Sequence, residues 1–108
     1  MGISTEWEDR LGGTVKRLVL STTGNADLVT AVPGRKLRVL NAQLCFSAAG
    51  TITFKSDTTS IGVVQAEAAG TVVLPGCTHG WLETVVGEKL ASSAGAITVS
   101  GTITYVEL

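Results

Sequence analysis

A two-residue alternation of apolar and polar side chains runs through most of this 108-residue chain, and it constrains the fold more than any other feature. Such alternation lines every second side chain along one face of a β-strand, whereas an amphipathic helix repeats about every 3.6 residues. A helical period is visible only near the start, in STEWEDRL (4–11). The clearest strand patterns are VKRLVLS (15–21), DLVTAV (27–32) and ITF (52–54). The chain is therefore predicted to be all-β.

Short segments rich in Gly, Pro, Asn and Asp separate the alternating stretches. Gly adopts positive φ angles without strain and Pro fixes φ, so these segments are expected to reverse the chain between strands. They divide the chain into about eight strands. The expected turns are TTGNAD (22–27), Pro33-Gly34, Ala49-Gly50, Ala69-Gly70, Pro75-Gly76 and Ala94-Gly95.

About eight short antiparallel strands in one domain suit a two-sheet sandwich. A jelly-roll order is favoured over an immunoglobulin-like one, because an immunoglobulin domain places a tryptophan between two paired cysteines. In this chain Trp81 follows both Cys45 and Cys77. Residues 1–13 are interpreted as an N-terminal arm, and residues 14–108 as a single sandwich domain.

One irregularity is expected inside a strand. Within RKLRVLNAQLCF (35–46), Leu37 and Val39 fall on one face, whereas Leu40 and the apolar residues after it fall on the other. An extra residue in one strand of a pair shifts the alternation in this way. We therefore expect a β-bulge near Val39.

Charge and sequence pattern exclude several functional classes. With 8 basic and 9 acidic residues the net charge is −1, so the chain lacks the basic excess that nucleic-acid binding requires. Its uncharged stretches are broken by Ser, Thr and Gly, so no membrane span is expected. Glu6, Glu8 and Asp9 occupy the place where a secretion signal has a basic end and an apolar run, so the chain is expected to be made and used in a cytoplasm.

The balance of charged and apolar residues bears on partners. Only 16% of the residues are charged, whereas 44% are hydrophobic. A small domain has a large surface for its volume, so this balance favours a surface that is partly covered by neighbours. Alternatively, many Ala and Val residues raise the apolar count without forming patches. Composition alone leaves both interpretations open.

The segment PGCTHGW (75–81) gathers a cysteine, the single histidine and a tryptophan, which raises the question of a metal or catalytic site. Zinc needs three or four ligands, and Cys77 and His79 supply only two, while Cys45 has no ligand motif beside it. A cysteine nucleophile would need His79 as its base, at a spacing that seldom permits that hydrogen bond. No metal, cofactor or catalytic residue is therefore expected here.

A structural interpretation of the same segment is preferred. Pro75-Gly76 ends one strand, Gly80 opens the next, and Trp81 is expected to close the end of the sandwich. Glu83 and Glu88 are the nearest pair of carboxylates, but Gly87 between them indicates a turn instead of a catalytic pair. The chain is accordingly not expected to be an enzyme.

Trp7 is the residue that most directly suggests an interface. It stands among acidic residues in the arm, where a large indole has little reason to occur unless it docks on a partner. Arg35, Lys36 and Arg38 form a small basic cluster, for which a solvated strand start is the alternative to a partner contact. The candidate interface residues are Trp7 with Glu6 and Leu11 from the arm, and Arg35 and Lys36 from the cluster.

Four segments resemble a known group of proteins. They are VPGRKLRVLNAQLCFSAAGTITF (32–54), GWLET (80–84), GEKL (87–90) and the ending GTITYVEL (101–108). Together they resemble small β-sandwich proteins encoded among the virion genes of tailed bacteriophages, and the similarity covers most of the chain after Val15. Cys77 and His79 have no counterpart in that pattern.

The resemblance implies a structural virion protein, in particular a head decoration or cement protein. Such a protein binds the major capsid protein, self-associates as a trimer or dimer, and stabilises the shell. Its expected location is the capsid surface, after synthesis in the host cytoplasm, with neither nucleic acid nor membrane as a partner. The alternative is a tail-tip or fibre head domain that binds a host surface glycan, for which exposed aromatic residues in a groove would be expected.

We predict that Cys45 and Cys77 stay reduced and that the protein binds no zinc, because the ligand number is too low and the expected compartment is reducing. Native mass spectrometry of the full chain should therefore give the mass of the bare, reduced polypeptide. A mass increase of one zinc ion, or a loss of two hydrogens from an intramolecular bridge, would contradict this prediction.

Overall fold

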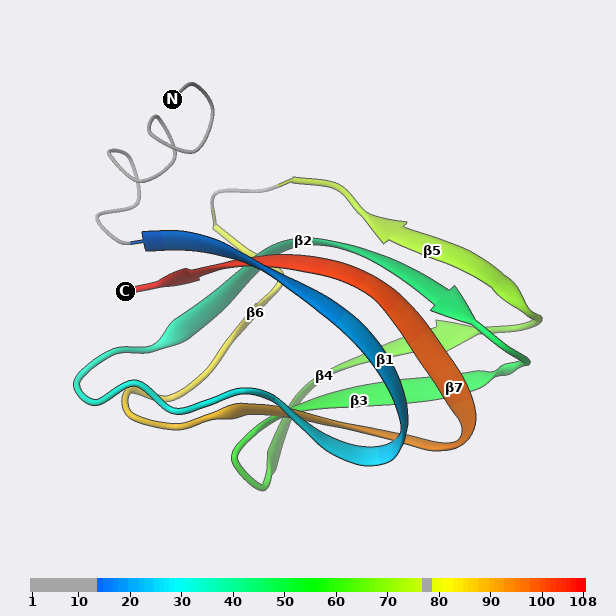
Figure 1. Ribbon diagram of the computed structural model, residues 1–108, viewed down its shortest axis with the longest axis horizontal. Coiled ribbons are helices and arrows are strands. Elements are labelled where there is room, and N and C mark those ends of the chain that lie inside the picture. The colour runs from blue at the N-terminus through cyan, green and yellow to red at the C-terminus, as the bar shows by residue number, and fades with distance from the viewer. Residues whose placement is uncertain (1–13, 77–78) are drawn as a thin grey trace.

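The computed structural model describes residues 14–76 and 79–108, and they form one antiparallel sheet of seven strands (Figure 1). No helix occurs in these two ranges, so the all-β prediction is confirmed. The strands are β1 (Thr14–Val29), β2 (Leu37–Phe46), β3 (Gly50–Ser56), β4 (Thr59–Ala66), β5 (Gly70–Leu74), β6 (Leu82–Glu83) and β7 (Leu90–Glu107).

Two long strands, β1 and β7, hold the sheet together. They pair with each other from Thr14 opposite Glu107 to Val29 opposite Leu90. The second half of β7 also pairs with β2, whereas its first four residues pair with β3. Beyond these neighbours, β5 pairs with β2 and β4 pairs with β3. The sheet therefore has two halves that share β1 and β7.

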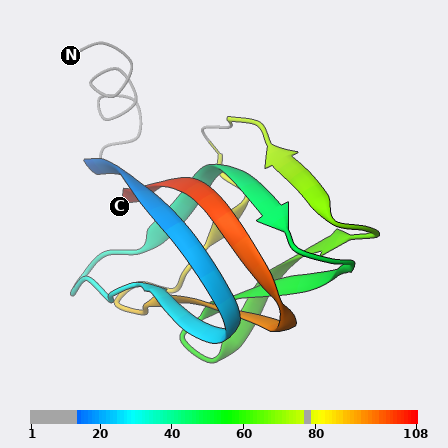
Figure 2. The ribbon, with the colours of Figure 1, turned by 45° about the vertical axis from the view of Figure 1, so that its right-hand side comes forward.

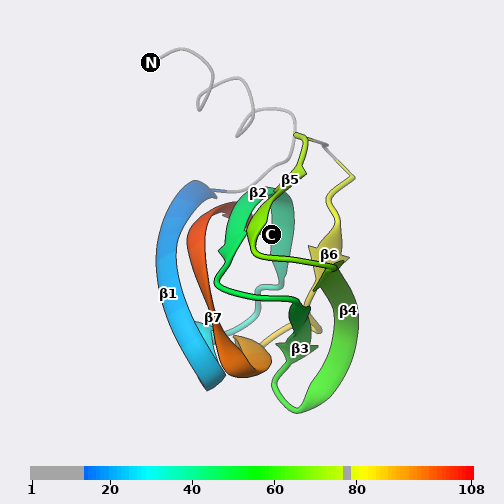
Figure 3. The same ribbon diagram turned by 90° about the vertical axis from the view of Figure 1, so that its right-hand side faces the viewer.

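Both shared strands bend, and the sheet curls into a half-barrel whose two layers face each other (Figures 2 and 3). The bends lie near Gly24, with φ 71°, and Gly95, with φ 66°. At the first bend the β1–β7 register shifts between Thr23 and Asn25. A bend with an irregular register lets one strand serve both layers, as at the corner of a barrel.

These bends correct two sequence-based expectations. The segments 22–27 and 94–95 were expected to reverse the chain, but each lies inside one continuous strand. A glycine with positive φ serves a bend as well as a turn, so the local sequence does not distinguish them. Each correction merges two expected strands into one, whereas the turn between β3 and β4 and the separate two-residue β6 add strands that were not expected. The described residues therefore hold seven strands where about eight were expected. The jelly-roll order stays a prediction.

The core lies between the two layers and is formed by the alternating apolar residues. Phe46, Phe54 and Tyr105 are all buried within it, each at most 8% exposed. The bulge expected near Val39 is confirmed, because the β2–β7 register shifts between Val39 and Asn41. Both Val39 and Leu40 are buried as a result, at 2% and 0% exposure. The phase change in the sequence thus reports a real irregularity of β2.

Gly101 is expected to be the glycine least tolerant of substitution. Its φ is 146°, a region that only glycine adopts readily, and a Cβ there would collide with the backbone carbonyl of Gln43 on β2. We expect Gly101→Ala to lower the stability by at least about 2 kcal/mol, which corresponds to a fall in Tm of about 10 °C or more.

Gly34→Ala is the matched control for this measurement. Gly34 also has positive φ, 74°, but a Cβ there would meet open space. The backbone strain of alanine at this positive φ should alone lower the stability of the Gly34→Ala variant by about 1 kcal/mol. Thermal unfolding followed by circular dichroism measures both variants, and equal Tm values for the two would show that β7 does not approach β2 closely at Gly101.

Candidate binding surfaces

The segment from Gly80 to Lys89 crosses one end of the sandwich, and backbone hydrogen bonds tie it to β2. The Trp81 amide donates to the Val39 carbonyl at 2.7 Å, and the Thr84 amide donates to the Leu37 carbonyl at 2.9 Å. In return the Leu37 amide donates to the buried Thr84 hydroxyl at 2.9 Å. Both backbone polar groups of Leu37 are therefore satisfied by one residue.

Gly80 permits this close approach. Its φ is 77°, and a Cβ would meet the Arg38 side chain and the Val39 carbonyl. Any other residue would push the segment away from β2 and weaken the hydrogen bond that the Trp81 amide donates. The Gly-Trp pair of the resemblance thus has a structural reason in this chain.

Ion pairs of Glu83 also hold the crossing segment against β2 and the residue before it. Its carboxylate accepts from the Arg38 Nε at 2.7 Å and lies 3.0 Å from the Lys36 Nζ. Partial burial raises the pKa of Glu83, but the hydrogen bonds and positive charges of Arg38 and Lys36 outweigh burial, so its pKa lies below the ordinary value of 4.5. Two members of the expected basic cluster therefore bind Glu83 instead of standing free.

Farther along, the segment is tied to β3. The Ser56 hydroxyl donates to the Glu88 carboxylate at 2.5 Å and accepts from the Val85 amide at 2.9 Å. Ser56 is only 1% exposed, so these bonds satisfy a polar group that burial would otherwise leave costly. Glu83 and Glu88 accordingly have separate structural partners.

The turn between β1 and β2 lies beside this segment, because the Gly87 amide donates to the Arg35 carbonyl at 2.7 Å. Val85 and Val86 are strongly exposed here, at 61% and 55%. Lys36 exchanges two backbone hydrogen bonds with Leu108, of 3.1 and 2.8 Å, so the C-terminal residue lies at the same end. We call Arg35, Lys36, Val85 and Val86 the docking end.

Of the five interface residues expected from sequence, only Arg35 and Lys36 can be placed. Trp7, Glu6 and Leu11 lie outside the described residues. Their point of attachment can be located, however, because Thr14 pairs with Glu107, and Glu107 also pairs with Leu37. Thr14, the residue that follows 1–13 in the chain, therefore lies at the docking end. Val85 and Val86 were not predicted as interface residues, because they follow the motif GWLET without any local signal of exposure.

An apolar groove of about 460 Å³ runs between β4 and Trp81. Trp81 is 47% exposed, and its Nε1 donates to the Pro75 carbonyl at 2.8 Å. The indole thus lines a groove at the edge of the sandwich, so the expectation that it closes the end is only partly correct. The lining side chains are Ile61, Val63, Val64, Gln65, Leu74, Trp81 and Leu82. Gln65 is the single polar one among them, which gives a sugar few hydrogen-bonding partners.

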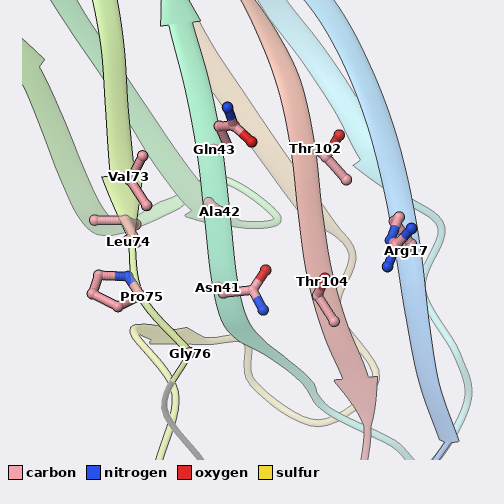
Figure 4. A pocket seen from close by; sticks show the side chains of 10 residues that line it. All are labelled: Arg17, Asn41, Ala42, Gln43, Val73, Leu74, Pro75, Gly76, Thr102 and Thr104. Carbon is pink, nitrogen blue, oxygen red and sulfur yellow. The ribbon is translucent and has the colours of Figure 1, made fainter. Parts of the chain in front are cut away.

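A second depression, of about 430 Å³, lies on the outer face of β1, β7, β2 and β5 (Figure 4). Strand register sets its polar side chains in two rows. Arg17 lies opposite Thr104, which lies opposite Asn41, and in the next row Thr102 lies opposite Gln43. We call these five residues the polar face.

The metal and catalytic interpretations of residues 75–81 gain no support from the described part of the chain. His79 and Cys45 are exposed, Cys45 carries a free thiol, and Cys77 lies outside the described residues. Across residues 14–76 and 79–108, no three His, Cys, Asp or Glu side chains gather closely enough to hold a metal ion. The same ranges contain no helix long and apolar enough to cross a membrane.

The fold and these surfaces define the class as a small all-β sandwich. No family model matches the chain, and no curated protein matches it. Among solved structures it is similar to the C-terminal CBM6 of LamC, a marine laminarinase from Zobellia galactanivorans, with TM-score 0.44 and 8% identity over 86% of this chain and 99% of that one. It is also similar to the insecticidal delta-endotoxin Cry8Ea1 from Bacillus thuringiensis, with TM-score 0.42 and 15% identity over 95% of this chain and 21% of that one.

The lowered pKa of Glu83 gives a pH-dependent prediction. A carboxyl whose pKa is depressed by folding stabilises the fold above its ordinary pKa, and that contribution is lost as the pH falls through the lowered value. Glu83→Gln should therefore lower the Tm by about 2 to 5 °C at pH 7, a small effect because the ion pairs are partly exposed. The difference from the wild type should vanish on acidification below the Glu83 pKa.

Thermal unfolding across a pH series measures this difference. The control is Glu67→Gln, an exposed glutamate between β4 and β5. It should leave the Tm nearly unchanged at every pH. A Glu83→Gln effect that persists at low pH would mean that the amide fails to replace a packing contact, and that the ion pairs do not carry the stabilisation.

Proposed function

We propose that the protein is a structural component of a tailed-bacteriophage virion, specifically a capsid decoration protein that binds the head surface and stabilises the shell. The docking end carries this proposal. It combines two exposed valines and two basic residues with the attachment point of an arm that contains a tryptophan. Apolar surface ringed by polar groups is characteristic of protein–protein contacts.

Attachment through this end is non-covalent and involves no catalysed reaction. The valines and Trp7 bury apolar surface against the major capsid protein, and each contact between neighbouring subunits opposes their separation. Head lattices repeat, so many copies with modest affinity strengthen the whole shell. Self-association as a trimer, or as a dimer, adds avidity because each copy bound raises the effective concentration of the next. Catalysis is no part of the proposed role.

Trp7 is proposed as the anchor of the arm. Burying an indole in a well-packed contact is worth roughly 2 to 4 kcal/mol, whereas exposed charges such as Glu6 contribute under about 1 kcal/mol. Leu11 and the valines of the docking end extend the same contact. The arm and the sandwich end then bind the capsid together.

The test mixes purified protein with undecorated heads and measures occupancy by cryo-electron microscopy and sedimentation. Val85→Asp/Val86→Asp should fold normally, because both side chains are exposed, yet bind about 100-fold more weakly if each valine contributes about 1.4 kcal/mol. Trp7→Ala should also reduce occupancy, and the heads should lose resistance to heat. Val63→Asp, at an exposed position on β4, is the matched control and should bind normally.

Three outcomes would count against the proposal. Full occupancy by both the Trp7 and the Val85/Val86 variants would exclude the arm and the docking end as the attachment site. Loss of binding by Val63→Asp alone would place the contact at the apolar groove. Binding of the wild type to host glycans, with none to heads, would favour the tail-tip or fibre alternative.

A further inference from the structure

We propose that the polar face binds a carboxylate-bearing polysaccharide, such as a polymer of uronic acids. This site goes beyond attachment to a capsid and involves none of the docking-end residues. The observation that motivates it is the state of the five polar side chains. Within the described residues, Arg17, Asn41, Gln43, Thr102 and Thr104 form no side-chain hydrogen bond or ion pair, although they share one depression.

The arrangement of these groups matches an extended chain of sugars. Neighbouring strands lie about 4.8 Å apart, a spacing comparable with the length of one sugar ring. The first row in Figure 4 therefore offers a donor or acceptor at successive ring positions across β1, β7 and β2, and the second row does so across β7 and β2. Asn41 and Gln43 each provide two amide donors and a carbonyl acceptor, and the threonines add hydroxyls. Sugar hydroxyls need this mixture of donors and acceptors.

Apolar contacts are available at both ends of the second row. Val19 on β1 pairs with Thr102, and Val73 on β5 pairs with Gln43. These valines are 78% and 60% exposed. The C–H face of a sugar ring can lie on such side chains while its hydroxyls bind the amides between them. A chain of sugars lying along this row would thus meet polar groups in the middle and apolar groups at the edges.

Arg17 decides the chemical class of the sugar. It is exposed, forms no ion pair within the described residues, and is the single charged side chain lining the depression. A guanidinium presents two parallel N–H donors to a carboxylate, which makes this pairing stronger and more specific than a contact with a neutral hydroxyl. A polymer that carries carboxylates therefore suits the face better than a neutral one.

Other macromolecules fit the polar face less well. Nucleic acids would need several basic side chains for the phosphates and aromatic rings for the bases. Among the described residues that line the depression there is one arginine and no aromatic residue. A protein partner would favour an apolar centre with a polar rim, whereas here the centre is polar and the valines lie at the edges. The polysaccharide is therefore the occupant to which we commit.

Affinity electrophoresis of the full-length protein provides the test. Native gels contain alginate or polygalacturonate, with neutral mannan and sulfated dextran in parallel gels, and isothermal titration with oligouronates of the retarding polymer gives the Kd. The wild type should be retarded by a uronate polymer and not by mannan. Arg17→Ala should weaken binding at least 10-fold, and Gln43→Ala should weaken it several-fold.

Matched variants separate the site from charge and from capsid binding. Arg17→Lys keeps the charge but loses the paired donors, so it should still bind more weakly than the wild type. Arg35→Ala removes an exposed arginine outside the face and should bind like the wild type. Val85→Asp/Val86→Asp should also keep uronate binding, so failure of the capsid proposal and failure of this one can be told apart.

Several results would overturn the inference. They are the absence of retardation by both uronate polymers, retardation of Arg17→Ala equal to that of the wild type, and retardation by sulfated dextran that Arg17→Lys leaves unchanged. The last result would show attraction to any polyanion instead of recognition of a carboxylate. Unchanged Tm values for the Arg17 and Gln43 variants confirm that the comparison concerns folded protein.

Discussion

The pairing of β1 with β7 is the interaction on which the rest of the structure depends. It joins residues near the start of the described chain to residues near its end, from Thr14 opposite Glu107 to Val29 opposite Leu90. Because β7 continues through its bend, it presents one half to β2 and the other to β3. The paired strands β1 and β7 therefore belong to both layers. Such long-range pairing must overcome the entropy of closing a loop of most of the chain, and burial of the core between the layers offsets that cost.

The crossing segment from Gly80 to Lys89 is the second structural requirement. It carries almost no regular structure, yet hydrogen bonds from Trp81 and Thr84 to β2, and from Ser56 to Glu88, hold both of its ends. These ties fix where Val85 and Val86 project, so the docking end owes its shape to polar contacts behind it. The GWLET and GEKL segments thus have a structural reason in this chain, because their contacts hold the crossing segment against β2 and β3.

The two proposed surfaces occupy different parts of one small sandwich. The docking end lies where the start of β1 meets the end of β7, whereas the polar face lies on the outside of β1, β7, β2 and β5 (Figures 1 and 4). They differ in chemistry as well: exposed valines with basic residues favour a protein partner, and unpartnered amides and hydroxyls favour a sugar. A virion protein attached through one surface would leave the other available to a polysaccharide. The two proposals can therefore both hold, or fail separately.

The sequence by itself determined the all-β class and the bulge at Val39, because alternation is a local property of a strand. It did not decide whether Gly24 and Gly95 turn or bend the chain, since the same positive φ serves both, and only pairing along the whole of β1 and β7 settles this. The polar face could not be predicted from the sequence either. Arg17, Asn41 and Thr104 are far apart in the chain, and only the strand register brings them into one row, because pairing partners are chosen by the packing of the whole core.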